Sequence, residues 1–286
     1  ALQDPEALAA FQARFADRLA GRTGPRPPAA DADADFEAQK RQRALFDAYA
    51  DHASEAHTDY ANTPFWQAVD ARVFRRWKAV LPAGGWLLDL GCANGRSSFP
   101  MADHFWVVGF DLSRKFLRTA IARATGVGVM ATNTFSGGDG GALPFRAASF
   151  ACVQTYGVLH HLPSPDRVVR EIQDLLLPGG SHLALENNRS VFRFLFDALM
   201  RLRPLWVEEA GDEPLISPAM LRDWCAGLPA RIEAETPVYL PPHLFNAVGP
   251  RLAGPLLALS DGLCGRVPGL ADNGGQTVAR IVKTAA

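Results

Sequence analysis

The hydrophobic pattern of the chain changes near residue 85. Before this point, residues 4–19 and 36–80 repeat apolar side chains at the spacing of amphipathic helices. After it, short apolar runs alternate with helical stretches, which is the pattern of strand–helix–strand units. Such units form a mostly parallel sheet with helices on both faces. The sequence therefore predicts a doubly wound α/β fold with an N-terminal helical segment.

Seven apolar runs have the length and composition of strands. They are residues 86–91, 105–110, 127–132, 150–156, 181–187, 231–238 and 278–285. Helices are expected near residues 96–104, 113–124 and 165–177, with a further helix-like stretch at 192–202. Ligands of such sheets bind outside the carboxyl ends of the strands, beside the first one.

The pattern divides the chain into four parts. Residues 1–35 combine an amphipathic helix with a connector rich in Pro, Gly and Asp, and residues 36–80 form a helical lid or cap. Residues 81–188 form the core that carries the ligand site. Residues 189–286 hold the last two strands and a long apolar insertion at 240–276.

Composition and charge exclude several classes of protein. The 286 residues are 48% apolar and 21% charged, which excludes disordered and fibrous chains. Lys and Arg number 29 against 30 Asp and Glu, so we expect no DNA partner. We see neither a signal peptide pattern nor an apolar stretch of membrane-spanning length, and therefore expect a cytoplasmic protein without an integral membrane segment. The four cysteines have no metal-ligand spacing, which indicates reduced thiols and no metal site.

A glycine turn follows the first predicted strand. In LLDLGCANGRSS, Gly91 and Gly95 let the main chain approach a ligand, and the N–H groups of the next helix are expected to face it. The spacing G-x-x-x-G matches neither a dinucleotide fingerprint nor a phosphate loop. Asp111 ends the second strand 20 residues later, where a carboxylate binds ribose hydroxyls, and Ser113 caps the following helix. Asp139 follows the third strand and suits an adenine amine, so the series predicts a nucleoside site.

This ordered series resembles the class I S-adenosylmethionine-dependent methyltransferases, within the broad group related to ubiquinone and menaquinone biosynthesis methyltransferases (methyltransferase type 11). The resemblance covers roughly residues 80–187 and rests on LLDLGCANG, GFDLS, residues 139–145, SFACVQTYGVLHHL and LLLPGG. It implies a Rossmann-like seven-stranded sheet whose residues 81–188 bind S-adenosyl-L-methionine. S-adenosyl-L-homocysteine is the implied product.

The resemblance also implies which residues bind the cofactor. They are Asp89, Gly91, Cys92, Ala93, Gly95, Asp111, Leu112, Asp139, Gly140, Thr155 and Tyr156. The turn would hold the methionine part, Asp111 the ribose, Asp139 and Gly140 the adenine, and Thr155 and Tyr156 would line the methionine end. The family usually has another glycine in place of Ala93, and alanine replaces it with least disturbance if the local φ is negative.

Methyl transfer from a sulfonium is an in-line displacement that requires neither a metal nor a covalent enzyme intermediate. Alignment of the two substrates therefore supplies much of the acceleration. A base matters when the acceptor must lose a proton. His160 and His161, just beyond the fourth strand, are the candidates, with structural support of the loop as the alternative.

Candidates for the acceptor side lie outside the cofactor motifs. His52, His57 and Tyr60 precede the sheet, in the segment that folds over the cofactor in similar methyltransferases, and they form a lid or pack on a helical cap. Glu186, Asn187 and Asn188 end the fifth strand and either face the acceptor or form a turn.

The insertion at 240–276 is expected to cap an apolar acceptor pocket together with residues 190–224, and a homodimer interface is the alternative. We therefore expect a methyltransferase that acts on a small organic acceptor, such as an isoprenoid, polyketide, sugar or lipid-linked metabolite. One alternative is an RNA-modifying methyltransferase, which the basic cluster between Arg72 and Lys78 supports. The glycine spacing of nicotinamide-dependent oxidoreductases is absent from this sequence. The last alternative is a non-catalytic S-adenosylmethionine-binding subunit.

Overall fold

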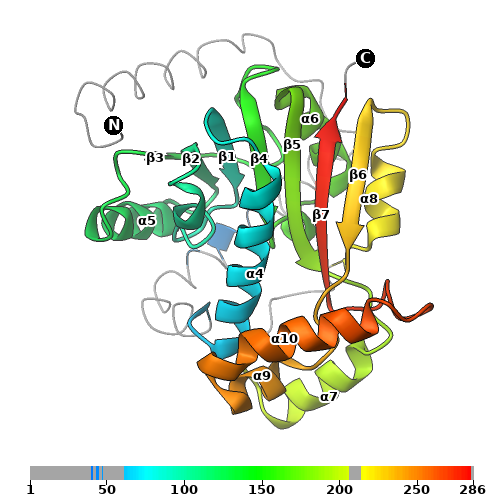
Figure 1. Cartoon of the computed structure of the whole chain (residues 1–286). Helices are drawn as coiled ribbons and strands as arrows, with labels where there is room; N and C mark the ends of the chain where they lie inside the picture. The colour runs from blue at the N-terminus through cyan, green and yellow to red at the C-terminus, as the bar shows by residue number, and fades with distance from the viewer. Residues whose placement is uncertain (1–39, 41–42, 45–46, 48–60, 206–213, 285–286) are drawn as a thin grey trace.

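The structure is a computed structural model that describes residues 40, 43–44, 47, 61–205 and 214–284. Its strands are β1 (Trp86–Leu90), β2 (Trp106–Asp111), β3 (Asn133–Gly137), β4 (Phe150–Tyr156), β5 (Leu176–Asn187), β6 (Ala230–Glu235) and β7 (Gln276–Lys283). They form one sheet in the order β3-β2-β1-β4-β5-β7-β6 (Figure 1). Only β7 runs antiparallel to its neighbours, β5 and β6, so the Rossmann-like, mostly parallel sheet is confirmed.

The helices cover both faces of this sheet. They are α4 (Pro64–Val80), α5 (Arg114–Gly126), α6 (Pro165–Leu175), α7 (Arg193–Leu202), α8 (Pro218–Trp224), α9 (Pro242–Val248) and α10 (Pro250–Cys264), with short 3-10 helices η1 (Phe99–Met101) and η2 (Leu159–His161). Leu87 and Leu88 are adjacent in β1 and both fully buried, yet Leu87 packs with α4 and Leu88 with α6. Side chains alternate across a strand, so α4 and α6 lie on opposite faces, as expected of a doubly wound fold.

The third strand lies later than the sequence predicted. Residues 127–132 form turns after α5, and β3 spans Asn133–Gly137 instead. β3 is an edge strand with a single fully buried residue, Asn133. It therefore lacks the continuous apolar run that identified the central strands.

The predicted helix at 96–104 is also wrong. These residues form turns around the 3-10 helix η1. Pro100 contributes to the difference, because proline has no N–H to donate to the carbonyl four residues earlier and so interrupts an α-helix that begins at residue 96.

The insertion at 240–276 belongs to the main core. Its helices α9 and α10 pack against α4, at the foot of the molecule beside α7 (Figure 1). The ring of Phe245 lies 5.5 Å from that of Phe65, and the Phe65 N–H donates to Asn246 Oδ1 over 3.0 Å. In α10, Asp261 pairs with Arg72 at 3.2 Å, and burial raises the pKa of this carboxyl. The insertion therefore holds α4 in place as well as bordering the site.

The expectation that residues 190–224 act together as a cap is wrong for α8. Leu221 of α8 packs with Val169 of α6 and Ala184 of β5, whereas the neighbouring Leu183 packs on the α4 side. Therefore α8 covers the opposite face of the sheet.

Within residues 61–205 and 214–284, no helix has both the length and the hydropathy that crossing a membrane requires.

A matched pair of substitutions in α9 tests whether the insertion is part of the core. Phe245 is 0% exposed and Leu244, beside it in the same helix, is 47% exposed. We expect Phe245→Ala to lower the free energy of unfolding by about 3–5 kcal/mol. Leu244→Ala is expected to change it by less than about 1 kcal/mol. Urea unfolding of the two variants measures the difference, and equal midpoints would contradict the packing described.

Candidate active site

Asp111 joins the glycine turn to the helix that follows β2. Its Oδ2 accepts the N–H of Ala93 and its Oδ1 that of Ser113, each at 2.8 Å. Ser113 caps α5 as predicted, because its Oγ accepts the Phe116 N–H over 3.3 Å. Burial raises the pKa of Asp111, and the two N–H groups oppose that rise. Each oxygen keeps a lone pair, which suits the two hydroxyls of a ribose.

The glycines of the turn are required by close packing. Gly91 and Gly95 have φ values of +74° and +83°, and a Cβ atom would come within 2.3 Å of Val158 at the first and 2.4 Å of Phe99 at the second. Alanine was expected to replace the usual glycine easily only at a negative φ, but Ala93 has φ +43°. An alanine in this left-handed conformation costs roughly 1–2 kcal/mol.

The main-chain N–H groups of the turn are used within the protein. Gly91 and Cys92 donate to the Phe110 carbonyl at 2.8 and 3.3 Å, and Gly95 donates to the Cys92 carbonyl at 2.8 Å. No α-helix follows the turn, so the expected array of helix N–H groups facing a ligand is absent there.

Asp89 of β1 stabilises the residues that follow the glycine turn. It is fully buried, and its Oδ2 accepts the hydroxyls of Ser97 at 2.8 Å and Ser98 at 2.5 Å. Its Oδ1 has no hydrogen-bond partner in the described part of the chain. Burial raises the pKa of Asp89 to about 6, although hydrogen bonds from Ser98, Gln154 and Ser97 oppose the rise.

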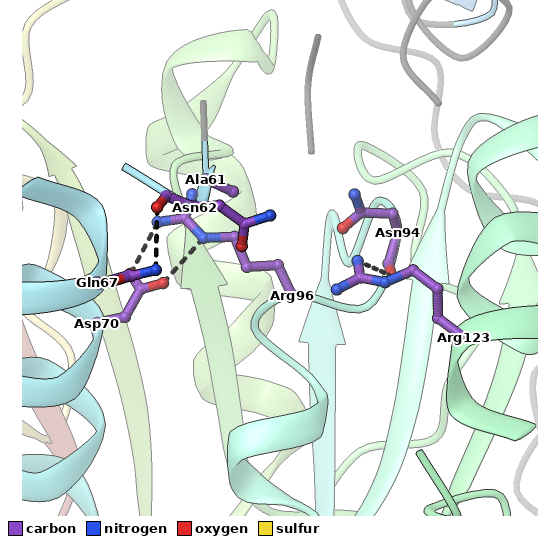
Figure 2. Close-up of a pocket in the computed structure, with 7 residues that line it drawn as sticks. All are labelled: Ala61, Asn62, Gln67, Asp70, Asn94, Arg96 and Arg123. Carbon is purple, nitrogen blue, oxygen red and sulfur yellow. Dashed lines mark hydrogen bonds and ion pairs between the residues drawn. The ribbon is translucent and has the colours of Figure 1, made fainter. Parts of the chain in front are cut away.

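A cavity of about 280 Å³, here called the polar cavity, lies between the turn and α4. It is lined by Ala61, Asn62, Gln67, Asp70, Asn94, Arg96 and Arg123 (Figure 2). Arg96 points at Asp70, with its Nε 2.9 Å from Oδ2 and its Nη2 2.8 Å from Oδ1. The same guanidinium stacks on Trp66 at 4.7 Å and on Tyr156 at 5.5 Å. These contacts hold one cation firmly at the end of β1.

Asn94 and Arg123 form the other side of the polar cavity. Arg123 donates from Nη1 to the Asn94 carbonyl oxygen over 2.9 Å, and burial followed by repulsion from Arg96 lowers its pKa. The Asn94 side chain is buried, and its Oδ1 has no partner among the described residues. Two cations and one unpaired carbonyl oxygen match the carboxylate and the ammonium of an amino acid.

The predicted adenine residues lie beyond β3. Asp139 Oδ1 accepts the Gly141 N–H over 2.7 Å, which fixes the carboxylate at the loop. At Gly140, a Cβ atom would come within 3.1 Å of Leu162. Leu112 is half-buried between Asp111 and Ser113. The carboxyl ends of β2 and β3 are paired in parallel, so Asp111 and Asp139 share one edge of the sheet.

Thr155 and Tyr156 differ in where they point. Thr155 is fully buried and its Oγ1 lies 2.9 Å from Nε2 of His182, whose pKa burial lowers to about 3. It therefore packs inside the sheet rather than lining a cavity, which corrects its predicted role. Tyr156 donates its hydroxyl to Asp70 and stacks on Phe74 with centroids 5.3 Å apart. Tyr156 thus supports the Arg96–Asp70 pair.

Glu186 organises the loop after β4 instead of facing an acceptor. Its Oε1 accepts the N–H groups of Val158 at 3.1 Å and Leu159 at 2.9 Å, and its Oε2 lies 2.5 Å from His160 Nδ1. Because Glu186 is fully buried with these partners, the expectation that it faces the acceptor is wrong. The His160 and His161 rings are 4.0 Å apart. The geometry favours a supporting role for His160, and catalysis by either histidine stays a prediction.

A second cavity of about 80 Å³, the apolar cavity, lies where β5 ends and β7 begins. It is lined by Phe65 and Trp66 of α4 and by side chains within residues 187–196, 238–242 and 275–276. Asn187 borders it, as expected of an acceptor residue, and accepts the Gln276 side-chain N–H over 3.1 Å. The two cavities are linked through Trp66, because Trp66 lines the apolar cavity and Arg96, which stacks on it, lines the polar one.

Three predicted lid residues, His52, His57 and Tyr60, lie outside the described residues. In the described part of the chain, no three His, Cys, Asp or Glu side chains are grouped so as to hold a metal ion. Cys92, Cys152 and Cys225 are buried free thiols, and Cys264 is a half-buried one.

Sequence reasoning missed Asp70, Asn94, Arg96 and Arg123. A signal existed for two of them. Arg96 directly follows the second glycine of the turn, and Asp70 is a carboxylate one helical turn beyond Trp66, on the apolar stripe of α4. Arg123 lies far along α5 and joins the cavity only through the fold.

Comparisons with known proteins place this geometry in a family. Residues 88–184 match the family model described as a methyltransferase domain. The chain is 32% identical over 146 residues to a 27-O-demethylrifamycin SV methyltransferase of Amycolatopsis mediterranei, covering 47% of this chain and 54% of that protein. It is 28% identical over 158 residues to a ubiquinone biosynthesis O-methyltransferase of Xanthomonas axonopodis, covering 53% and 65%. The chain thus spans little more than half the length of these relatives.

Solved structures show the same fold. A phosphoethanolamine N-methyltransferase of Haemonchus contortus superposes with a TM-score of 0.61 at 14% identity, over 88% of this chain and 50% of that one. The [4+2]-cyclase SpnF superposes with a TM-score of 0.55 at 20% identity, over 77% and 83%. Both a methyltransferase and a cyclase share the fold, so the fold alone does not define the chemistry.

Family match and geometry together define the class. Residues 88–184 match a methyltransferase domain, and the sheet has the fold expected of class I S-adenosylmethionine-dependent methyltransferases. S-adenosylmethionine is the cofactor of that family.

Because the Asp89 carboxyl is buried, we expect its replacement by a neutral side chain to stabilise the fold by an amount that depends on pH. Its folded pKa of about 6 lies above the ordinary aspartate value of 3.8, so the folded state binds more protons between these values and loses stability as the pH rises through them. Asp89→Asn removes the cost of burying an ionised carboxylate. We expect the free energy of unfolding to rise by about 3 kcal/mol at pH 8 and by about 1 kcal/mol at pH 4.5. Urea unfolding at both pH values measures it.

The control for this prediction is Asp103→Asn. Asp103 is largely exposed and pairs with Lys78 at 2.9 Å, so its substitution should show little pH dependence. Destabilisation of Asp89→Asn at pH 8 would instead show that the ionised carboxylate is needed to hold Ser97 and Ser98.

Proposed function

We propose that the protein transfers the methyl group of S-adenosylmethionine to a small organic acceptor. The observation that carries the proposal is the arrangement at one sheet edge of Asp111, Asp139 and the polar cavity, inside a matched methyltransferase domain. When bound, S-adenosylmethionine supplies an electrophilic methyl group on a sulfonium.

The donor set fits this cofactor. Asp111 has lone pairs for two ribose hydroxyls, and Asp139 lies on the neighbouring strand for the adenine amine. Asn94 Oδ1 is an unpaired acceptor for an ammonium, and Arg123 suits a carboxylate because Arg96 is already paired with Asp70. Arg96 is fixed by Asp70, Trp66 and Tyr156, so the methionine end would be held against α4.

The chain's own contribution to the reaction is mainly positioning. A displacement at a methyl group gains from alignment of donor and acceptor and from exclusion of water, an effect that supplies roughly 7–11 kcal/mol in favourable cases. Apolar walls from α4, α7 and residues 238–242 would exclude water beside Asn187. This supports the expected capping role for α7 and for the start of the insertion. A homodimer stays a prediction.

The relatives favour a small acceptor over RNA. Their names include methyltransferases for demethylrifamycin, ubiquinone biosynthesis and demethylmenaquinone, which fits an isoprenoid or polyketide acceptor. A mouse relative, 28% identical over 131 residues, is named as a probable tRNA methyltransferase. However, Arg72 and Arg76 pair with Glu235, and Lys78 pairs with Asp103, so most of the basic cluster is neutralised.

Substitution of Asp111 tests the cofactor site. Asp111→Asn keeps the size of the side chain but removes its charge and one acceptor oxygen, so we expect roughly 30-fold weaker binding of S-adenosylhomocysteine. Isothermal titration calorimetry measures the affinity, and thermal unfolding without ligand checks that the variant is folded. Asp103→Asn serves again as the matched control. Unchanged affinity in Asp111→Asn would place the ribose elsewhere.

Turnover separates an enzyme from a non-catalytic subunit. We expect transfer of labelled methyl from S-adenosylmethionine to hydroxylated aromatic or isoprenoid compounds, at a rate that does not fall with salt. Binding of S-adenosylhomocysteine without transfer to any compound would favour the non-catalytic subunit. Transfer to tRNA that falls steeply with salt would favour the RNA-modifying alternative.

A further inference from the structure

We infer that the apolar cavity binds the hydroxyl-bearing end of a neutral, largely apolar molecule through two buried amide oxygens, Asn188 Oδ1 and Gln276 Oε1. That this molecule is the methyl acceptor rests on the proposed function. That the cavity binds such a molecule rests on the cavity alone and is tested separately.

Asn188 is held so that its carbonyl oxygen is left over. The residue is 1% exposed, and its Nδ2 donates to the main-chain oxygens of Asp272 at 3.1 Å and Gly274 at 2.8 Å. Two carbonyl partners fix which end of the amide carries the nitrogen. Asn188 Oδ1 is then buried without a partner in the described part of the chain.

Gln276 presents a second oxygen of the same kind beside it. It begins β7, is 6% exposed, and pairs in register with Asn187 at the end of β5. Its Nε2 donates to Asn187 Oδ1 over 3.1 Å, and its Oε1 has no partner among the described residues. Both Asn188 and Gln276 line the apolar cavity. Buried acceptors are almost always hydrogen-bonded, so these two oxygens indicate a donor supplied by a ligand or by water.

The rest of the lining selects for a neutral and apolar partner. No carboxylate lines the apolar cavity, so a cationic ligand finds no counter-charge among the described residues. Among the described residues the lining has one cation, Arg193, whose Nε lies 2.6 Å from Asp197 Oδ1 and whose guanidinium lies 5.0 Å from the Phe196 ring. Its charge is already paired, so an anion gains little there. The remaining walls are mostly aromatic, aliphatic and proline side chains.

Size adds a further restriction. A volume of about 80 Å³ is well below that of a site for a whole drug-sized molecule. The cavity therefore suits one ring or one short end of a ligand. A phenol or an alcohol at the end of an apolar body satisfies all three conditions.

The test compares p-cresol with p-xylene, which replaces the hydroxyl by a methyl group of similar size. Gln276→Met removes the acceptor oxygen and keeps the apolar length. We expect this variant to bind p-cresol about tenfold more weakly than the unmodified chain, while its affinity for p-xylene changes less than about twofold. Ligand-observed NMR titrations give both dissociation constants. Equal changes for the two compounds would overturn the inference.

Gln173→Met is the matched control, because Gln173 is a buried glutamine on α6 that does not line the cavity. It should leave both affinities unchanged. A crystal structure of the unmodified chain with p-cresol gives a test that needs no variant. The phenol oxygen should lie within about 3.2 Å of Asn188 Oδ1 or Gln276 Oε1. A phenol oxygen elsewhere in the cavity, or water on both amide oxygens beside the bound ring, would overturn the inference.

Titration with S-adenosylhomocysteine separates the two proposals. We expect Gln276→Met to bind it as tightly as the unmodified chain, because Gln276 does not line the polar cavity. If the unmodified chain does not bind S-adenosylhomocysteine, the proposed function fails while the p-cresol result still decides the cavity. If it does bind, but Gln276→Met weakens p-cresol and p-xylene alike, only the inference about the cavity fails.

Discussion

The Asp111 carboxylate is the constraint on which the cofactor side depends. Its two oxygens accept one N–H from the glycine turn and one from the start of α5, so a single side chain fixes three elements relative to one another. The Phe110 carbonyl adds to this by accepting the N–H groups of Gly91 and Cys92. The end of β2 therefore determines the path of the turn that leaves β1. The strained φ of Ala93 is stabilised by the same bond, because its N–H is the one that Asp111 accepts.

Several buried polar groups lie near the carboxyl ends of the central strands. Asp89, Asn94, Glu186, Asn188 and Gln276 are all largely buried, and all but Glu186 retain a side-chain oxygen without a partner in the described chain. Burying such groups is unfavourable. The apolar clusters on both faces of the sheet offset that cost. The apolar core therefore tolerates these buried polar groups next to the two cavities.

Sequence alone predicted most of the fold correctly, for identifiable reasons, whereas the cofactor side of the site stays a prediction. Central strands such as β1 and β4 are buried on both faces and so appear as continuous apolar runs, whereas the edge strand β3 does not. The place of Asp111 at a strand end could be predicted without knowledge of packing, whereas Asp139 was placed after a third strand expected at residues 127–132 and in fact follows β3 at Asn133–Gly137.

Other parts of the site depend on tertiary contacts that no local pattern encodes. Asp70 meets Arg96 only because α4 packs across β1, and the two are 26 residues apart. Gln276 reaches Asn187 only because β7 inserts antiparallel between β5 and β6, at a separation of 89 residues. Glu186 and Thr155 were placed at the correct strand ends, but their side-chain directions follow from the loop and the sheet interior.

The position of β7 has an evolutionary consequence. The polar cavity and the acidic strand ends are built from residues 61–139, whereas most of the apolar cavity comes from residues 187–276, with α4 as the shared wall. Sequence changes in residues 187–276 can therefore alter the apolar cavity, while residues 61–139 and the polar cavity are inherited unchanged. A lineage of such proteins can diversify its products without having to reinvent the methyl source.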